Sequence, residues 1–455
     1  MAETPEPGAS TPTGGIIEPR TPKGFRDALP PRALAVERCV EGAREVLHRH
    51  GFAPIRTPAL EFEEVLTGKG GSESDRQMYR FADPSGRRVG LRFDLTVPLA
   101  RFVSQHRGTL PFPVSLYQWG TVWRGENTQR GRSREFLQFD FDTLGADSAM
   151  ADAGIVTVVH EILRRLQAPP FTIRLNSRTL LTNVVRHAGI PEAAVAQVLR
   201  VVDKLAKLGH AAVEAELAEL GATPEQVKAL LAAVEVQGPA GDVVRELQAH
   251  GLGSALDDSA QRLLDMSAWV EAAGVPAGAC VVDLSIARGL DYYTGMVFET
   301  TLNDLPDIGS VCSGGRYDRL TAMFSRDEPV AGVGGSVGID RLLDGVEALG
   351  LATARSTTAY ALFAVFDGVP PERYLALAAA ARSAGVNAQV YPGVQRLQKQ
   401  MRFADRAGFG AVVLVGPDEL ASGVAQVRRL ADGATTSAPF DGLPAVLREL
   451  QAGEA

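Results

Sequence analysis

The segment WRGENTQRGRSREFLQFDFD, residues 123–142, decides the fold of this chain. Together with the preceding PVSLYQWGTVWR (113–124), it is typical of two strands joined by a polar loop. Because successive side chains on a strand point to opposite sides, the second strand has one apolar face and one polar face. The polar face suits the border of a pocket as well as a solvent-exposed surface. Its residues are Phe136, Gln138, Asp140 and Asp142, opposite Leu137, Phe139 and Phe141.

The loop between these strands is rich in arginine. Arg124, Arg130, Arg132 and Arg134 lie close together around its glycines and amides. A guanidinium group fits phosphate oxygens with two parallel hydrogen bonds and stays charged. Most charged loops are simply solvated, but Arg124 directly follows an apolar strand that can hold its side chain. We therefore expect a phosphate or nucleic-acid contact here, with a solvated hairpin loop as the alternative.

The length of 455 residues is too great for one core and indicates two to four domains of roughly 150 residues each. A hydrophobic content of 45% and a charged content of 22% are typical of globular proteins. No run of 18 uncharged apolar residues occurs, so we expect no membrane-spanning helix. Residues 1–20 are rich in Pro, Gly and Thr, lack the features of a signal peptide, and are predicted to form a disordered tail.

The net charge of −8 argues against a general binder of polyanions, although it leaves room for a local basic groove. The three cysteines, Cys39, Cys280 and Cys312, are far apart and lack the spacing of a metal site. We expect buried, reduced thiols and a cytoplasmic protein.

Before residue 350 the pattern of helices and strands is irregular. Apolar spacing predicts a helix over 31–50, then a strand after Gly51 whose prolines confine it to an edge or an interface. Residues 89–103 are typical of a strand that passes into a helix. An Ala- and Leu-rich region over about 185–272 predicts a helical insertion. Further strands are expected at 279–286, 296–302 and 332–337, and a helix at 340–349.

The C-terminal part has a different pattern. Residues 352–359, ATARSTTA, are typical of a linker. Beyond them, strands such as YALFAVF and AVVLVG alternate with helices that begin near Pro371 and Gln395. Strands separated by helices predict a parallel sheet with crossover connections, and therefore a separate α/β domain.

Two further segments carry polar groups at fixed spacing. In LRFDLTVP (91–98), Asp94 and Thr96 would face the same way on a strand, as an ammonium group requires; the alternative is an Asp that caps the next helix. RGLDYYTG (288–295) places Arg288 and two tyrosines between glycines, and its alternative interpretation is a turn with tyrosine rings packed for stability.

Two glycine-rich segments follow. SVCSGGRYDRL (310–320) predicts a Gly-Gly turn followed by Arg316 and Asp318. GVGGSVGIDRLL (332–343) predicts a strand running into a helix with Arg341 in its first turn. Such a junction alone is a weak signal for phosphate binding.

Taken together and in this order, these segments resemble the histidyl-tRNA synthetase family of class II aminoacyl-tRNA synthetases. GFAPIRTPALE, with Pro58, resembles the first motif of the class, which forms a dimer interface; residues 123–142 resemble the second motif and 332–343 the third. RGLDYYTG and SVCSGGRYDRL resemble two signatures peculiar to the histidine enzymes. QRLQKQMRFADRAGFGAVVLVG resembles the anticodon-binding domain.

The resemblance implies an α+β fold in which flanking helices cover an antiparallel sheet. It implies a class II catalytic domain over 21–350, containing the helical insertion, and an α/β anticodon-binding domain over 358–455. It also implies the reaction: L-histidine and ATP form histidyl-adenylate and pyrophosphate, and the histidine then passes to the 3′ end of its tRNA.

The resemblance also implies roles for individual residues. Arg124 would bind the α-phosphate of ATP, Arg341 the γ-phosphate, and Glu126 the adenine or a metal-bound phosphate. Arg288 would stand beside the α-phosphate, where other class II enzymes use a metal ion. Mg²⁺ is expected with the ATP phosphates but with no protein metal site of its own.

For histidine itself, the resemblance implies that Asp142 and Tyr293 bind the imidazole, with Tyr292 beside them. It implies that Asp94, Thr96 and Gln138 hold the α-ammonium group. Fixed partners for both ring nitrogens reject other amino acids, because a wrong ligand leaves buried polar groups unpaired. The tRNA acceptor end would meet Gln129 and Arg130.

The chain departs from the family pattern at several positions. Many bacterial members have Glu at the positions of Asp94 and Asp142, and Arg at the position of Asn127. We expect the backbone or a water molecule to compensate for the shorter carboxylates, and the acceptor contact to use Gln129 and Arg130 instead.

Two other functions are open. One is a non-catalytic regulatory subunit of ATP phosphoribosyltransferase, a paralogue that usually lacks the anticodon domain and catalytic residues. The other is a histidine or uncharged-tRNA sensor, which would need an effector domain for which we expect no room. Because the chain keeps Arg124, Arg288 and Arg341, we expect the synthetase, as a homodimer without a membrane partner.

Overall fold

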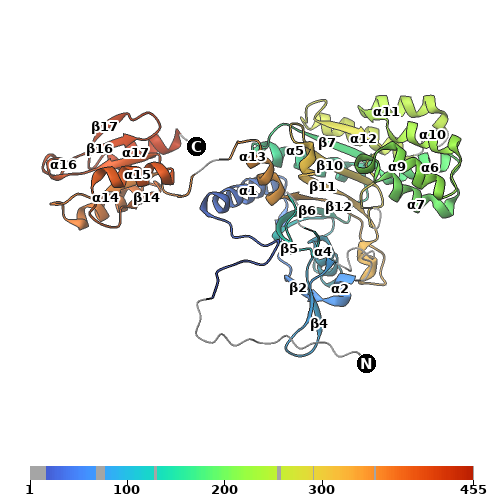
Figure 1. Ribbon diagram of the computed structural model, residues 1–455, viewed down its shortest axis with the longest axis horizontal. Coiled ribbons are helices and arrows are strands. Elements are labelled where there is room, and N and C mark those ends of the chain that lie inside the picture. The colour runs from blue at the N-terminus through green and yellow to red at the C-terminus, as the bar shows by residue number, and fades with distance from the viewer. Residues whose placement is uncertain are drawn as a thin grey trace.

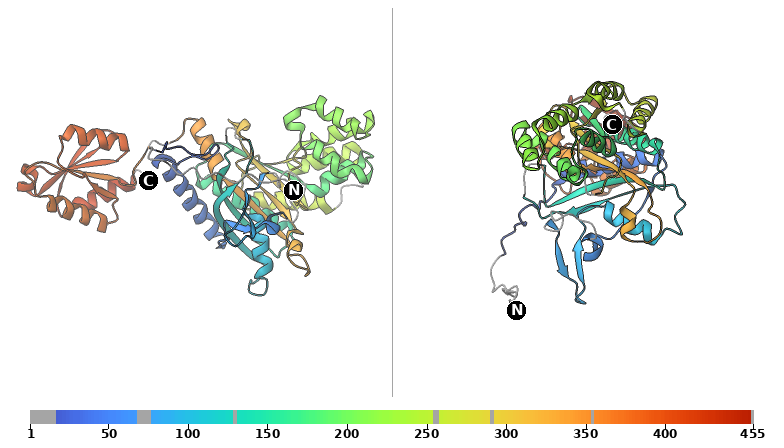
Figure 2. Two further views of the ribbon diagram at one scale, coloured as in Figure 1. Left: turned by 60° about the horizontal axis from the view of Figure 1, so that its bottom comes forward. Right: turned by 90° about the vertical axis from the view of Figure 1, so that its right-hand side faces the viewer.

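The computed structural model describes residues 17–67, 77–127, 131–253, 258–289, 292–352 and 355–453. They form a larger unit around a nine-stranded sheet and a smaller C-terminal unit around a five-stranded sheet. Figure 1 and the left view of Figure 2 show the smaller unit apart from the larger one. The nine-stranded sheet has the order β1-β5-β6-β12-β11-β10-β7-β9-β8.

The centre of the large sheet is antiparallel, as the sequence predicts. The two strands of the opening segment, β5 (Val114–Trp123) and β6 (Glu135–Leu144), pair along their full lengths. β12 (Gly332–Gly338), β11 (Cys312–Tyr317) and β10 (Met296–Leu302) extend the sheet antiparallel.

The remaining strands form the two ends of the sheet, where parallel pairs occur. The pairings of β1 with β5 and of β7 with β9 are parallel, whereas β7 with β10 and β8 with β9 are antiparallel. The bounds are Ala53–Pro54 for β1, Phe171–Ser177 for β7, Gln237–Gly238 for β8 and Cys280–Asp283 for β9.

Close packing explains why one prediction is wrong. The sequence predicts a Gly-Gly turn in SVCSGGRYDRL, but Gly314 and Gly315 lie inside strand β11. A Cβ atom on Gly314 would come within 2.1 Å of the carbonyl oxygen of Gly334 on the neighbouring strand. Glycine is therefore required here by the close approach of two backbones and not by a turn.

The apolar face of β6 packs against helices. Phe139 and Phe141 are fully buried, and their core includes Val46 and Leu47 of α1 and Ile162 of α5. A third helix, α13, contacts both α1 and β6. These helices span Pro30–Arg49 (α1), Ala149–Arg165 (α5) and Ile339–Ala348 (α13). The opposite face of β6 is left for the polar residues.

The sequence predicts one continuous strand after Gly51, and this prediction is wrong. The segment forms two short strands instead. β1 ends at Pro54 and a new strand, β2, begins at Leu60, because the prolines at positions 54 and 58 cannot donate to a ladder. β2 belongs to a three-stranded sheet with the order β2-β4-β3, which contacts helix α2, and α2 in turn contacts α4. The bounds are Leu60–Phe62 (β2), Glu63–Thr67 (α2), Arg80–Ala82 (β3), Arg88–Leu91 (β4) and Thr96–Gln105 (α4).

The region predicted as a helical insertion is helical and gathers at the end of the larger unit away from the C-terminal unit (Figure 1). Its apolar faces share the core of the large sheet. The helices are α6 (Arg178–His187), α7 (Glu192–Val202), α8 (Leu205–Leu208), α9 (His210–Glu219), α10 (Pro224–Val234), α11 (Ala240–Leu247), η1 (Gln248–Leu252) and α12 (Asp258–Ala272). Short 3-10 turns, η2 (Pro306–Ile308) and η3 (Leu320–Met323), follow β10 and β11.

The C-terminal unit has the predicted alternation only in its first half. The strands β14, β13 and β15 pair in parallel, as crossover connections require, but β15, β16 and β17 pair antiparallel, so the sheet is mixed. The bounds are Ala361–Ala364 (β13), Pro371–Ser383 (α14), Ala388–Val390 (β14), Leu397–Ala407 (α15), Ala411–Leu414 (β15), Pro417–Ser422 (α16), Val424–Arg429 (β16), Thr435–Pro439 (β17) and Leu443–Ala452 (α17).

Some predictions fall outside the described residues. Residues 1–16 of the expected tail and residues 353–354 of the expected linker are among them. The three cysteines are free thiols. Within the ranges that the structure describes, no helix has the length and apolar character needed to cross a bilayer.

A buried ion pair joins the sheet to the helices. Arg316 of β11 is 2% exposed, and its Nε donates to Oδ1 of Asp152 on α5 at 2.8 Å. The other oxygen of Asp152 accepts a hydrogen bond of 2.9 Å from Nε of Arg262 on α12. Asp152 is itself fully buried, so two arginines compensate the cost of taking its charge out of water.

Replacing Asp152 by alanine should strongly destabilise the protein, because Arg316 would lose its fully buried partner and keep only more exposed carboxylates, such as Asp318 at 3.1 Å. The loss expected on breaking such a pair is about 3–5 kcal/mol. Urea denaturation monitored by circular dichroism would measure it.

Asp147 provides the matched control, since its carboxylate also pairs with Arg262, at 2.9 Å, but is 64% exposed. Asp147→Ala should cost no more than about 1 kcal/mol. Equal losses for the two variants would contradict the importance of the buried pair.

Candidate active site

Two adjoining cavities lie on the polar face of the large sheet. We call them the arginine cavity, which includes Arg124, Arg132 and Arg341, and the acidic cavity, which includes Asp94, Asp140 and Asp142. Their volumes are about 210 and 470 Å³. They share one wall, whose residues line both cavities: Arg124, Arg132, Gln138, Arg288, Ser313 and Ser336.

Arg124 lies directly after the end of β5 and is held by the protein on two sides. Its Nε donates to the carbonyl oxygen of Phe93 at 2.9 Å, and its guanidinium carbon lies 5.1 Å from the centre of the Phe136 ring. These contacts fix the direction of the side chain, so that its charge is placed before any ligand arrives.

Arg341 lies in the first turn of α13, as the sequence predicts. Its Nη1 donates to the carbonyl oxygen of Ser310 at 2.8 Å and its Nε to that of Gly131 at 3.3 Å. Burial, together with the nearby positive charges of Arg132, Arg288 and Arg124, lowers its pKa to about 10. Burial is the largest cause, and the neighbouring guanidinium groups act in the same direction.

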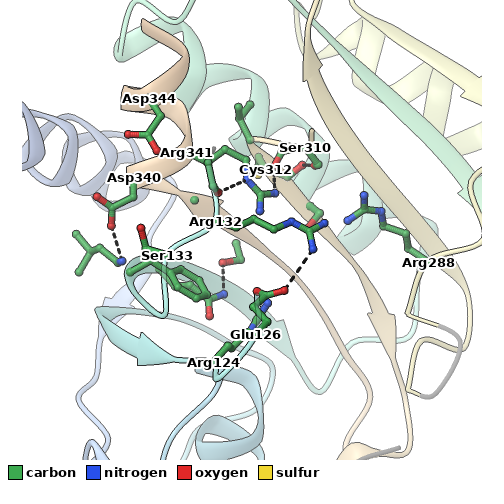
Figure 3. Close-up of a pocket in the computed structure, with 18 residues that line it drawn as sticks. Arg124, Glu126, Arg132, Ser133, Arg288, Ser310, Cys312, Asp340, Arg341 and Asp344 are labelled. Atoms are coloured by element: carbon green, nitrogen blue, oxygen red, sulfur yellow. Dashed lines mark hydrogen bonds and ion pairs between the residues drawn. The ribbon is translucent and has the colours of Figure 1, made fainter. Parts of the chain in front are cut away.

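Arg132 and Arg288 reach the same space from different elements. Figure 3 shows their guanidinium groups pointing toward one another, with Arg132 also joined to Glu126. The Arg132–Glu126 distance is 3.3 Å, and Arg288 forms an ion pair with Glu299 of β10. Burial lowers the pKa of Arg288, and Arg132 lowers it too, whereas Asp203, from the helical insertion, raises it.

Four guanidinium groups thus line one small cavity beside the carboxylate of Glu126. Like charges at close range repel one another and favour the binding of an anion that lies between them. Because each guanidinium group can donate two parallel hydrogen bonds to phosphate oxygens, the arginine cavity suits a polyphosphate.

The acidic cavity has the opposite charge. Asp140 and Asp142 of β6 are 2% and 5% exposed. Burial raises the pKa of Asp142 to about 7, against the hydrogen bond of 2.6 Å that it accepts from Tyr317. Burial and the neighbouring Asp142 carboxylate raise the pKa of Asp140 well above its usual value. The cavity therefore favours a ligand that brings positive charge or N–H donors.

Asp94 and Thr96 both line the acidic cavity, but not through the strand geometry that the sequence predicts. The strand ends at Leu91, and Thr96 is the first residue of α4. Oδ1 of Asp94 accepts a hydrogen bond of 3.0 Å from the amide of Val97, so Asp94 caps the helix and also borders the cavity. Burial raises the pKa of Asp94 as well.

The two tyrosines of RGLDYYTG line the acidic cavity, with their ring centres 4.2 Å apart. Gly289 has a φ of +63°, and a Cβ atom there would lie 1.9 Å from the Tyr293 ring. Only glycine allows Tyr293 to lie on this backbone. Burial raises the pKa of Tyr293, which keeps its hydroxyl group protonated as a hydrogen-bond donor. Leu290 and Asp291 lie outside the described residues.

The structure brings together Arg124, Glu126, Arg288 and Arg341 around one cavity, and Asp94, Thr96, Gln138, Asp142, Tyr292 and Tyr293 around the other. Gln129 and Arg130 lie outside the described residues. Sequence reasoning assigned no role to four further residues of these cavities. They are Arg132, Asp140, Glu299 and Ser336.

The described residues contain no group of three or more His, Cys, Asp or Glu side chains able to hold a metal ion. Glu126, which pairs with Arg132, is one of three carboxylates that line the arginine cavity, with Asp340 and Asp344. A divalent ion would fit here only if phosphate oxygens of a ligand completed its shell, which is the manner in which Mg²⁺ is usually bound.

Asp142 should make stability depend on pH. Because its pKa is raised in the folded protein, the unfolded chain loses the proton first, and folding stability falls as pH rises from about 4 to about 7. A shift of about three units corresponds to roughly 4 kcal/mol.

We therefore expect Asp142→Asn to gain stability relative to the original protein between pH 5 and pH 8, as measured by the difference in Tm. The exposed Asp307 is the control, and Asp307→Asn should show no such trend. A Tm difference for Asp142→Asn that stays constant with pH would contradict this interpretation.

Comparison with known proteins identifies the two parts of the chain. The family model for histidyl-tRNA synthetase matches residues 24–342, and the model for the anticodon binding domain matches residues 370–450. A histidine–tRNA ligase of Rhodopirellula baltica is 44% identical over 91% of this chain and 94% of its own length. One from Wolinella succinogenes is 40% identical over the same shares.

The solved structures agree on the fold. The crystal structure of a histidyl-tRNA synthetase from Nostoc sp. PCC 7120 has a TM-score of 0.87 at 32% identity, covering 95% of this chain and all of that one. It therefore shares the α+β architecture of a class II synthetase. On the family match and on the identity to these relatives, the chain belongs to the histidyl-tRNA synthetase family.

Proposed function

We propose that the two cavities are the ATP half and the histidine half of one active site. As a member of this family, the protein is a histidine–tRNA ligase: it uses ATP, generally with a divalent metal ion, to join histidine to its tRNA. The observation that supports our division is a difference between the two cavities: Arg341 lines only the first, whereas Asp94, Asp140 and Asp142 line only the second.

In the ATP half, Arg124 and Arg288 would hold the α-phosphate and Arg341 the γ-phosphate. All three border the same cavity, and Arg124 and Arg288 also border the acidic cavity, where the histidine carboxylate would approach. We assign Arg132 to the phosphates too, since it stands between Arg288 and Arg341. The ring of Phe136 offers a flat apolar face on which a purine can stack.

The reaction in this half is mainly a matter of positioning and charge. The histidine carboxylate attacks the α-phosphorus, a P–O bond to it forms, and the bond to pyrophosphate breaks. Fixed guanidinium groups stabilise the charge on the phosphate oxygens without having to reorganise. Mg²⁺ would supply further positive charge at the phosphates, with Glu126 as the protein carboxylate beside it.

In the histidine half, Asp142 and Tyr293 would bind the two ring nitrogens, and Asp94, Thr96 and Gln138 the α-ammonium group. Asp142 accepts hydrogen bonds, and the protonated hydroxyl of Tyr293 donates one, so the pair suits a neutral imidazole with one N–H and one bare nitrogen. Tyr292 would pack against Tyr293 and support it.

For the second step, we propose that Gln129 and Arg130 meet the acceptor end of the tRNA, and that the C-terminal unit binds its anticodon. The match of residues 370–450 to the anticodon binding domain supports the latter. The domain bounds that we propose are 21–350, including a helical insertion over about 185–272, and 358–455.

A homodimer in the cytoplasm is also part of the proposal. Apolar side chains near the segment that resembles the first motif are exposed, including Phe62 at 46%, Phe81 at 44% and Trp119 at 43%. Phe62 and Phe81 both lie opposite Val89 in the small sheet and so share one patch. A second copy could cover this patch. Three free cysteines suit a reducing compartment.

The regulatory-subunit alternative is not favoured. A Bacillus halodurans structure described as an ATP phosphoribosyltransferase regulatory subunit/histidyl-tRNA synthetase has a TM-score of 0.72, but at 22% identity it shows the fold alone. The regulatory paralogue usually lacks the anticodon domain, whereas residues 370–450 of this chain match that domain.

Replacing Arg288 by alanine tests the proposed catalysis. Histidine-dependent exchange of pyrophosphate into ATP should fall roughly 10²–10³-fold in kcat, the usual effect of removing one fixed group that stabilises transition-state charge. Arg186→Ala is the control, because Arg186 is a surface residue of the helical insertion paired with Glu192. If the original protein showed no histidine-dependent exchange, the proposed enzymatic activity would be refuted. Full activity in Arg288→Ala would refute the proposed role of Arg288.

Replacing Arg130 by alanine tests the tRNA assignment. We expect slower aminoacylation of tRNA with unchanged ATP–pyrophosphate exchange, because only the second step needs the acceptor end. Steady-state assays of both reactions on one preparation would measure this. Equal loss of both activities would count against a tRNA role.

A further inference from the structure

The orientation of one amide in the shared wall is fixed by a chain of hydrogen bonds. Nε2 of Gln138 donates to the hydroxyl oxygen of Ser336 at 2.8 Å, and this hydroxyl group donates to Oδ1 of Asp140 at 2.5 Å. Asp140 and Ser336 stand directly opposite each other in the β6–β12 pair, and Gln138 is the next residue on the same face of β6. The chain therefore connects neighbouring positions of two central strands.

The direction of these bonds follows from the number of protons. A serine hydroxyl has one proton, and Oδ1 of Asp140 accepts it whether the carboxyl group is ionised or carries a proton on Oδ2. Because the Ser336 hydroxyl group uses its one proton in the hydrogen bond to Asp140, its oxygen can only accept a further hydrogen bond. Gln138 must therefore present its NH₂ group to Ser336. The carbonyl end of the amide is then directed away from Ser336.

The carbonyl oxygen of the Gln138 amide lacks a hydrogen-bond partner within the described residues. This oxygen, Oε1, is buried. A buried acceptor without a partner costs about 1–3 kcal/mol, which a donor from a bound ligand would recover. Gln138 borders both cavities, so such a donor can arrive only from the ligand side.

Packing alone is a weaker account of this arrangement. Asp140 is 2% exposed and lies close to a second buried carboxylate, Asp142, whose charge disfavours its own. The positive charge of Arg124 lowers the pKa of Asp140, and the carboxylate of Asp94 opposes that effect. A residue needed only to fill space would not require a buried carboxyl group at this position.

We propose that Ser336 and Asp140 are positioning residues that fix the amide of Gln138 so that its Oε1 accepts a hydrogen bond from the α-ammonium group of histidine. The proposal rests on the function proposed above and extends it to two residues that do not touch the substrate's reacting atoms. An amide turned by 180° would present NH₂ to the ammonium group and repel it.

The first test is Ser336→Ala, measured by ATP–pyrophosphate exchange. Without the hydroxyl group the amide can adopt either orientation, and the KM for histidine should rise about tenfold, in line with a lost hydrogen bond to a charged group. The KM for ATP should stay within about twofold. Ser336→Thr keeps a hydroxyl group and should restore the histidine KM.

Two competitive inhibitors separate positioning from general damage to the cavity. Histidinol keeps the ammonium group but lacks the carboxylate, and 3-(imidazol-4-yl)propionate keeps the carboxylate but lacks the ammonium group. In Ser336→Ala, the inhibition constant of histidinol should rise about tenfold, while that of imidazolylpropionate should not change. Equal weakening of both inhibitors would overturn the proposal, because a distorted cavity would affect them alike.

Asp140→Asn tests the far end of the chain. An asparagine can donate as well as accept, so the Ser336 hydroxyl loses its fixed direction, and the histidine KM should rise as in Ser336→Ala. The double variant should be no worse than either single one, since all three break the same chain. Additive effects would overturn the proposal.

A matched control is Ser115→Ala, which removes a hydroxyl group paired with Thr143 at 3.0 Å in the same sheet, away from both cavities. It should leave all constants unchanged. If the unaltered protein shows no histidine-dependent exchange, the proposed function itself fails; if it does, and Ser336→Ala leaves the histidine KM unchanged, only the positioning role fails.

Discussion

The alternation of side chains along β6 is the constraint on which the rest of the structure depends. On one side, Phe139 and Phe141 are fully buried against α1 and α5 and hold the large sheet to its helices. On the other side, Gln138, Asp140 and Asp142 line the acidic cavity. A shift of the register by one residue would bury the carboxylates among the helices and expose the phenylalanines to the ligands. Folding and substrate binding therefore impose the same register.

The candidate active site combines two cavities in which burial disfavours the charged form of the side chains. Guanidinium groups repel one another in the arginine cavity, and burial disfavours the carboxylates of the acidic cavity, as the pKa values of Arg341 and Asp142 report. A ligand that carries phosphates at one end and N–H donors at the other relieves both at once.

Much of this could be predicted from the sequence, because the signals were local. The pairing of β5 with β6, the helix after β12 and the position of Arg341 follow from periodicity within one segment. The turn expected at Gly314 was wrong, since the reason for glycine lies in a neighbouring strand. Likewise, the roles of Ser336 and Asp140 depend on a pairing between residues 196 positions apart, which no local pattern contains.

The contact between Arg262 and Asp152 has a consequence for how this architecture can change. The helices of the insertion lie together at one end of the molecule, as a separately exchangeable part would (Figure 1). Its last helix, however, supplies one of the two arginines that neutralise a fully buried carboxylate beneath the sheet. The other, Arg316, packs against Gly295, at the end of RGLDYYTG. A chain that lost or exchanged the insertion would need a new cation at this point, so the insertion and the segment RGLDYYTG are constrained to evolve together.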